Sequence, residues 1–215
     1  MGAGIEIYNT NGVMQITEKF INLQFKGKGT VNLTNVASDG AYYYDLYLPD
    51  TSEQIAFSAT LGNPFVLLGR VFTRSNQLAA RIMSKISGTQ VTYYRFGAAS
   101  VVSGSCFEVY NSSGSLVFSD NARFMKVIDS KSGSSTSETE TLLATTASTL
   151  NKAVLPGNLC FTARGSIVKL AQQGFLLTAN SVESKIYPWF NYGGSYSIVA
   201  QETNYNYLVL DVTGL

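Results

Sequence analysis

A duplicated hairpin pattern constrains this chain more than any other feature of its sequence. Residues 5–18 read IEIYNTNGVMQITE and residues 107–120 read FEVYNSSGSLVFSD, at an offset of 102 residues (from 5 to 107). In both copies apolar and polar residues alternate around an Asn- and Ser-rich turn that ends in glycine, which is typical of a β-hairpin with one buried face. Four positions are identical, namely Glu6/Glu108, Tyr8/Tyr110, Asn9/Asn111 and Gly12/Gly114. The sequence therefore predicts two related halves.

Turn-bounded runs of aromatic and β-branched residues predict further strands along both halves. The expected ranges are 42–48, 54–59, 65–73, 90–96, 158–163, 175–179, 196–202 and 205–212. Short strands at this spacing are typical of a β-sandwich. The sequence thus predicts an all-β fold with two β-sandwich-like halves. The small-residue segment 98–105 separates the copies, so an N-terminal β domain is expected over 1–103 and a C-terminal β domain over 104–215.

Two weaker matches extend the repeat beyond the hairpins. The pair Gly62-Asn63 matches Gly157-Asn158, and each pair precedes an apolar run. The aromatic stretch 93–97 resembles 189–193, and both stretches end in glycine. Because the matches keep their order along the chain, we expect them at equivalent places in the two halves.

Two segments depart from the strand pattern. Apolar residues follow Ser75 at the spacing of one helical face (Leu78, Ala79, Ile82, Met83 and Ile86), so a short helix is predicted near 76–86. Residues 129–140 read DSKSGSSTSETE and contain no apolar residue. Because nothing anchors this tract in a core, it is predicted to be a mobile, exposed loop within the C-terminal domain.

The composition indicates a folded protein with a neutral, polar surface. Hydrophobic residues make up 45% of the chain, which is enough for an apolar core without metals or disulfides. Charged residues make up only 13%, against about 25% in typical soluble domains. The net charge of +1 gives no field that would concentrate nucleic acid, so a nucleic-acid partner is not expected. Uncharged polar surfaces suit contacts with other proteins or with sugars.

The N-terminal residues and the cysteines predict a protein made in a reducing cytosol. The opening MGAGIEIY lacks the basic and apolar regions of a secretory signal, and its sixth residue is Glu where myristoylation wants Ser or Thr. No run approaches 18 apolar residues, so membrane insertion is not expected. Cys106 and Cys160 lie in apolar, strand-like runs and are predicted to be buried free thiols rather than a disulfide.

The side-chain chemistry indicates a protein that is not an enzyme and needs no cofactor. The chain has no histidine and only two cysteines, which excludes Ser-His-Asp and Cys-His catalysis and a tetrahedral zinc site. A carboxylate pair for glycoside hydrolysis needs only two acids that the fold brings together. Asp45, Asp50 and Glu53 cluster around a proline turn, but solvated loop acids are the preferred interpretation.

Aromatic side chains are the best candidates for contacts with a partner. Tyrosine and tryptophan rings stack on sugars and anchor protein interfaces. Strand alternation sends Tyr42 and Tyr44 to one face and Tyr43 to the other, so some of these rings must be core. The candidate contact residues are Trp189, Tyr187, Tyr192, Tyr43 and Tyr94.

The hairpin-plus-strand unit resembles a known family. Residues 4–17 (GIEIYNTNGVMQIT) and 107–120, with RFMKVID at 123–129, are similar to small tail-associated proteins of lambda-like, long-tailed bacteriophages and prophages. In that family a Gly-x-Glu-Val-Tyr-Asn-x-x-Gly opening precedes an apolar strand and then an aromatic-Met-basic-Val strand. The first copy departs from the pattern, because Lys19-Phe20-Ile21 stands in place of Arg-Phe-Met.

The resemblance implies a structural virion protein of the tail tip or tail fibre, assembled in the host cytoplasm. Such a protein docks on a larger tail assembly and aids host attachment, with no catalytic or metal residues. Its implied partners are other phage tail proteins, a host surface glycan or receptor, and further copies of itself. The alternative is a carbohydrate-binding or receptor-binding adhesin module that uses the exposed aromatics, and a carboxylate-only glycan hydrolase is a more distant third.

Overall fold

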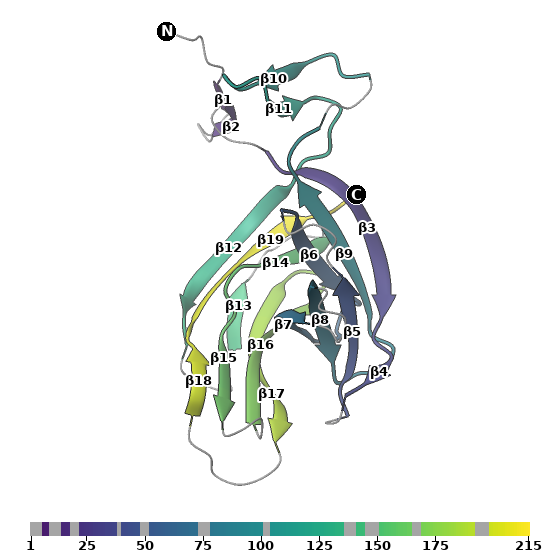
Figure 1. The fold of residues 1–215 in the computed structure, drawn as a ribbon, viewed down its shortest axis with the longest axis vertical. Coiled ribbons are helices and arrows are strands. Elements are labelled where there is room, and N and C mark those ends of the chain that lie inside the picture. Colours follow the sequence, from purple (N-terminus) through teal and green to yellow (C-terminus); the bar gives the residue numbers. More distant parts are fainter. Residues whose placement is uncertain are drawn as a thin grey trace.

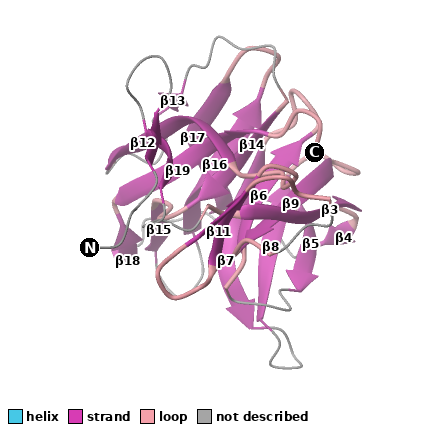
Figure 2. Cartoon of the chain, turned by 90° about the horizontal axis from the view of Figure 1, so that it is seen from above, coloured by secondary structure: helices cyan, strands magenta, loops and turns pink. Residues whose placement is uncertain are grey.

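The protein is an assembly of β-strands. The computed structural model describes residues 6–8, 14–17, 22–37, 40–47, 52–72, 78–100, 104–135, 141–144, 151–164, 169–191 and 198–215. Within these ranges there is no helix, and two large antiparallel sheets pack on one another, which confirms the all-β, sandwich-like prediction (Figures 1 and 2). Accordingly, the described ranges contain no helix that could span a membrane.

The first sheet has six strands in the order β12-β19-β14-β6-β9-β3. Their bounds are β12 Lys126–Ser134, β19 Asn204–Asp211, β14 Lys152–Pro156, β6 Gln54–Ala59, β9 Gln90–Gly97 and β3 Gln24–Asn32. Three strands come from each half, and the order in one half mirrors the order in the other. One row of paired residues crosses the whole sheet: Gly29, Tyr93, Phe57, Val154, Val209 and Asp129.

The second sheet has nine strands, and six of them show the same mirrored order. Its main path is β13-β17-β16-β7-β8-β5-β4, and β15 pairs with both β16 and β18. The bounds are β13 Thr141–Ala144, β17 Val182–Asn191, β16 Lys169–Leu177, β7 Phe65–Phe72, β8 Leu78–Ser84, β5 Tyr42–Tyr47, β4 Asn35–Val36, β15 Phe161–Arg164 and β18 Ile198–Glu202.

The two halves share both sheets instead of forming a sandwich each. In the six-stranded sheet β6 and β14 pair at Val154↔Phe57, and in the nine-stranded sheet β7 and β16 pair at Phe175↔Phe65. The main core lies between the sheets and takes large side chains from both halves, among them Phe57, Phe65, Phe175 and Tyr207. The halves are therefore related in topology but joined through one core.

The helix predicted near 76–86 is wrong, because residues 78–84 form β8 between β5 and β7. The strand is buried on both faces: Ile82 belongs to the core between the sheets, whereas its neighbour Met83 packs in a cluster on the other face. A strand covered on both faces has a nearly continuous apolar run, and such a run shows no two-residue period.

Three other sequence-based predictions need correction. The loop expected over 129–140 is strand as far as Ser134, because β12 pairs with β19 along its whole length; residues 136–140 lie outside the described ranges. The stretches 93–97 and 189–193 are not equivalent, since β9 and β17 belong to different sheets. Both cysteines are free, as predicted, and Cys160 is buried, but Cys106 is exposed because it precedes the short β10 strand (Glu108–Tyr110) instead of lying in a core strand.

The duplicated hairpins form with identical registers. β1 (Glu6–Tyr8) pairs with β2 (Met14–Thr17), and β10 pairs with β11 (Leu116–Ser119), every paired position being offset by 102 residues. Both registers shift at the same place, before the tyrosine. Figure 1 shows the two hairpins together at one end of the molecule, clear of the sheets. The two equivalent hairpins predicted from the repeat are therefore confirmed.

Candidate functional site

The hairpins are attached to the sheets by a neck in which the two copies of the repeat cross. Gln24 and Phe124 form an isolated antiparallel bridge. The Phe25 amide donates to the Arg123 carbonyl at 2.7 Å, and the Met125 amide donates to the Leu23 carbonyl at 2.8 Å. Leu23 and Met125 also pack on the outer face of the six-stranded sheet. The neck therefore fixes where the hairpins leave the body (Figure 1).

The turn of the second hairpin is built by Asn111 and Gly114. The Asn111 side-chain oxygen accepts hydrogen bonds from the amides of Ser113 and Ser115 at 3.1 and 2.8 Å. Gly114 has a φ of 78°, a left-handed conformation that other residues adopt at a cost. The recurrence of Asn and Gly in the sequence is thus explained by the turn, since asparagine side chains close turns in this way.

The second hairpin presents aromatic rings in a row along its base. The Phe107 and Phe118 ring centroids are 6.2 Å apart, and Phe118 stacks on Phe124 of the neck at 5.0 Å. Phe107 is 42% exposed and Tyr110 is 46% exposed. The Tyr110 hydroxyl donates to the Glu108 carboxylate at 2.6 Å, and this bond raises the pKa of Tyr110. Phe107, Phe118 and Phe124 form the row, whereas the exposed Tyr110 ring lies beside Glu108. We term these four rings, all at the hairpin end of the molecule, the aromatic end.

Two of the predicted contact tyrosines lie together on the outer face of the nine-stranded sheet. Tyr43 and Tyr187 both pack against the cluster of Ala41, Val66 and Met83, on the face opposite to the core between the sheets. The Arg81 guanidinium lies 4.4 Å above the Tyr43 ring, a cation–π contact. Tyr42 and Tyr44 pack against the main core, which confirms the alternation expected along this strand.

The other predicted aromatics are dispersed. Tyr94 is buried on the outer face of the six-stranded sheet, with the neck residues Leu23 and Met125 in the same cluster. Trp189 lies in β17, but its side chain is outside the described part of the structure, and Tyr192 is outside the described residues. The candidates that the structure describes therefore lie on two different sheets and do not form one stacking platform.

Two of the three acidic residues considered for catalysis are paired with arginines. Asp45 accepts two hydrogen bonds from Arg81 at 2.7 and 2.8 Å, and Glu53 accepts two from Arg95 at 2.6 and 2.8 Å. Asp45 belongs to the nine-stranded sheet, whereas Arg95 belongs to the six-stranded sheet, so the two pairs are separate. Asp50 lies outside the described residues. Among the described residues no three His, Cys, Asp or Glu side chains gather as a metal site.

A polar cleft of about 480 Å³ lies where the two halves meet in the six-stranded sheet. Because β6 and β14 pair only at Val154↔Phe57, the strands diverge toward Ala59 and Lys152, and the cleft occupies this gap. Its lining comes from four segments: Ser58, Ala59, Thr60, Leu61, Gln90, Thr92, Tyr94, Asn151, Lys152, Leu177, Thr178 and Ala179. The sequence identified Tyr94 among these residues, but it carried no motif that joins the four segments.

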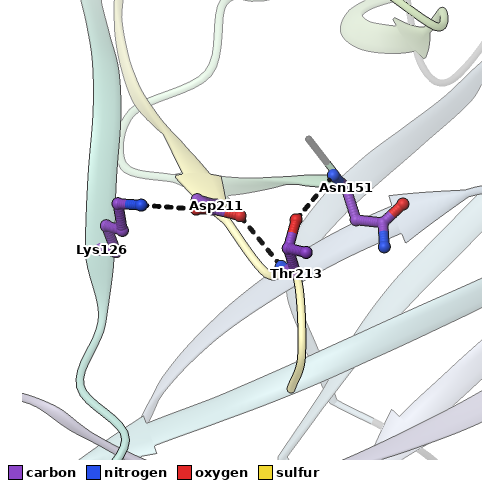
Figure 3. Close-up of polar contacts among 4 residues, drawn as sticks. All are labelled: Lys126, Asn151, Asp211 and Thr213. Atoms are coloured by element: carbon purple, nitrogen blue, oxygen red, sulfur yellow. Dashed lines mark hydrogen bonds and ion pairs between the residues drawn. The ribbon is translucent and has the colours of Figure 1, made fainter. Parts of the chain in front are cut away.

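A hydrogen-bond network positions Asn151 at the edge of the cleft (Figure 3). The Asp211 carboxylate accepts hydrogen bonds from the Lys126 ammonium at 2.7 Å and from the backbone amide of Thr213 at 2.9 Å. The Thr213 hydroxyl in turn accepts a hydrogen bond from the backbone amide of Asn151 at 3.0 Å. Burial alone would raise the pKa of Asp211, but the hydrogen bonds from Lys126 and Thr213 outweigh it and leave the pKa below its ordinary value. The carboxylate is thus held ionised between β12 and the C-terminal turn.

Comparisons with protein-family models, with curated proteins and with solved structures find no match to this chain. The aromatic end and the polar cleft are consequently the features from which its function has to be inferred.

Proposed function

We propose that this protein is a structural component of a phage tail, in the tail tip or a tail fibre, and that it docks on a larger tail assembly through the aromatic end. The observation that carries the docking role is the exposure of Phe107 and Tyr110 on a hairpin that stands clear of both sheets (Figure 1). The assignment to a phage tail is supported by the resemblance of the hairpin-plus-strand motif at 107–129.

The aromatic end has the properties of a docking surface. Exposed rings that are already held in place lose little conformational entropy on binding, and aromatic residues often dominate binding energy at interfaces. Phe118 is held in place between Phe107 and Phe124, so the row is ordered before any partner arrives. Val127, at the start of β12 beside the neck, adds a further exposed apolar side chain at 45% exposure.

A scaffold role also fits the remaining chemistry. The acids that sequence analysis singled out and the structure describes are held by arginines, which supports a structural use of these carboxylates. The duplication supplies two hairpins at one end, and the second copy alone carries the Arg-Phe-Met sequence at 123–125. Two related hairpins with different flanking strands suit an adaptor that contacts other tail proteins, including further copies of itself.

The test is incorporation into particles. Phage encoding the double variant Phe107→Ala/Tyr110→Ala should yield washed virions with this chain reduced by about tenfold or more, because losing two aromatic anchors costs at least one power of ten in affinity. Quantitative mass spectrometry of the particles measures the amount. Tyr47→Ala is the matched control, since Tyr47 is 53% exposed on β5 of the nine-stranded sheet and is not part of the aromatic end.

The double variant must fold like the natural protein, which thermal unfolding of the purified chain checks. Equal incorporation of the double variant and the control would contradict docking through the aromatic end. A natural chain that is missing from washed particles would contradict the virion role itself.

A further inference from the structure

We propose that the polar cleft between β6 and β14 binds an acidic sugar residue, a pyranose ring that carries a carboxylate. This site is independent of the docking role, because its lining shares no residue with the aromatic end. At about 480 Å³ the cleft falls within the usual range of small-ligand sites, which is about 300–1,000 Å³.

The uncharged part of the lining matches a polyol. Ser58, Thr60, Thr92 and Thr178 contribute hydroxyls, and Gln90 and Asn151 contribute amides. Three of the hydroxyls have partners in the protein, among them the Gln90 carbonyl for Thr60, Thr30 for Thr92 and Ser181 for Thr178, and a hydroxyl can make more than one hydrogen bond. Hydroxyls and amides both donate and accept hydrogen bonds, as the hydroxyls of a sugar do. This uncharged part of the lining therefore suits the hydroxyl groups of a sugar.

The apolar part of the lining suits the flat face of a pyranose ring. Tyr94, Leu61 and Leu177 supply the large apolar side chains of the lining, and Leu61 is the exposed one among them. Leu61 is 60% exposed, so it offers apolar surface to an arriving ligand. Apolar C–H surfaces of sugars pack on side chains of this kind, because ring faces and aliphatic groups have no hydrogen bonds to lose.

The charge of the lining distinguishes an acidic sugar from a neutral one. Lys152 is the one residue of this lining that carries a charge at neutral pH, and no carboxylate is among the lining residues. Lys152 is only 5% exposed, so its charge acts with little screening by solvent. A carboxylate on the ligand would therefore be attracted into the cleft.

Lys152 is also held in a fixed position. Its ammonium group donates to the Ala179 carbonyl at 2.8 Å, which joins the start of β14 to the end of β16. Its backbone pairs with Asp211 of β19, the residue that anchors the network around Asn151 (Figure 3). The cation and the backbone at Asn151 are thus held in place before a ligand arrives, which reduces the entropy lost on binding.

Isothermal titration calorimetry with the full-length chain tests this proposal, with glucuronate, N-acetylneuraminate, glucose and inorganic phosphate as separate probes. The expected result is binding of at least one carboxylated sugar, with an affinity for glucose at least about tenfold lower because glucose lacks the charge that Lys152 attracts. The comparison between glucuronate and N-acetylneuraminate identifies which acidic sugar the cleft prefers. Binding of phosphate alone would overturn the sugar proposal, as would equal binding of glucose and glucuronate.

Variants locate the binding in the cleft. Lys152→Met keeps most of the side-chain volume and removes the charge, so it should abolish the preference for the acidic sugars. Thr92→Val, which removes a lining hydroxyl at constant shape, should weaken binding even if Lys152→Met does not fold. Ser132→Ala, on an exposed position of β12 outside the cleft, is the control. Unchanged binding by Thr92→Val together with unchanged or unmeasurable Lys152→Met would overturn the site.

Discussion

Phe65 and Phe175 pair with one another across the line where the two halves meet, and their ring centroids lie 5.9 Å apart. Both side chains are fully buried in the core between the sheets, where Tyr207 lies edge-on to Phe175 at 5.1 Å. The contact joins strands β7 and β16, which belong to different copies of the repeat. The duplicated halves therefore depend on each other for their core.

The first prediction concerns cooperativity. Phe175→Ala should lower the free energy of unfolding by about 3–5 kcal/mol, because it leaves a cavity in the shared core. The natural protein and the variant should each unfold in a single transition, as followed by far-UV circular dichroism and by the fluorescence of Trp189. Phe107→Ala, at an exposed ring, should change stability by less than about 0.5 kcal/mol. Two separate transitions, one for each half, would show that the halves fold independently.

The second prediction concerns the close approach of β16 to β7. A Cβ added to Gly174 would lie 2.4 Å from Val66 Cγ1 and 2.7 Å from the Phe65 carbonyl oxygen, so the strands would have to separate. Gly174→Ala should therefore destabilise the protein by about 1–3 kcal/mol. Gly97→Ala is the control, because a Cβ there meets only the flexible Lys26 and Glu53 side chains at 3.4 Å or more. Equal denaturation midpoints for the two variants would refute the packing argument.

The third prediction concerns acid stability. Hydrogen bonds from Lys126 and Thr213 hold the pKa of Asp211 below its ordinary value, so this carboxylate stabilises the fold above the unfolded-state pKa of about 3.9. The stabilisation is lost as the pH falls through the lowered folded-state pKa. Asp211→Asn should cost about 1–3 kcal/mol at pH 7 and progressively less in acid. Urea denaturation between pH 2 and pH 7 measures both.

Asp129→Asn provides the comparison for this pH series. Asp129 pairs with Lys131 at the longer distance of 3.5 Å, so its loss should cost less than about 1 kcal/mol. A difference between natural protein and Asp211→Asn that stays constant down to pH 2 would contradict the assigned role of the Asp211 carboxylate.

The fourth prediction concerns the pH dependence of ligand binding in the cleft. Burial lowers the pKa of Lys152 from its ordinary value of 10.5, so the ammonium loses its proton earlier in an alkaline titration than a surface lysine does. Affinity for an acidic sugar should be constant near neutral pH and fall as the pH rises through this lowered pKa. Lys152→Arg should retain binding to higher pH, because the guanidinium stays charged. A flat profile for the natural protein would rule out a contribution from the lysine charge.

The sequence predicted the hairpins well because their pattern is local. Alternation on both sides of Asn111 and Gly114 specifies the turn, the register and the buried face within about a dozen residues. The edges of β6 were also predicted correctly, because its run of apolar and polar residues is bounded by turn signals. In both cases the signal lies within one short segment of the chain.

Long-range arrangement was not predictable in the same way. The pairing of β6 with β14 and of β7 with β16 depends on contacts about a hundred residues apart, and no local pattern encodes them. Strand β14 was missed, and β8 was mistaken for a helix, because strands buried on both faces lack alternation. The cleft was missed because it too depends on long-range pairing: Ser58, Lys152 and Thr178 are far apart in the chain and meet only where the two halves join.

Site-directed cross-linking from Cys106 in intact virions tests the proposed docking role most directly. Cys106 is an exposed free thiol next to Phe107, whereas Cys160 is buried and should not react. A photoreactive maleimide attached at Cys106 should cross-link the chain to another tail protein, or to a second copy, after assembly and illumination. Cross-links found solely within a single copy of the chain, in particles that contain it, would contradict docking through the aromatic end.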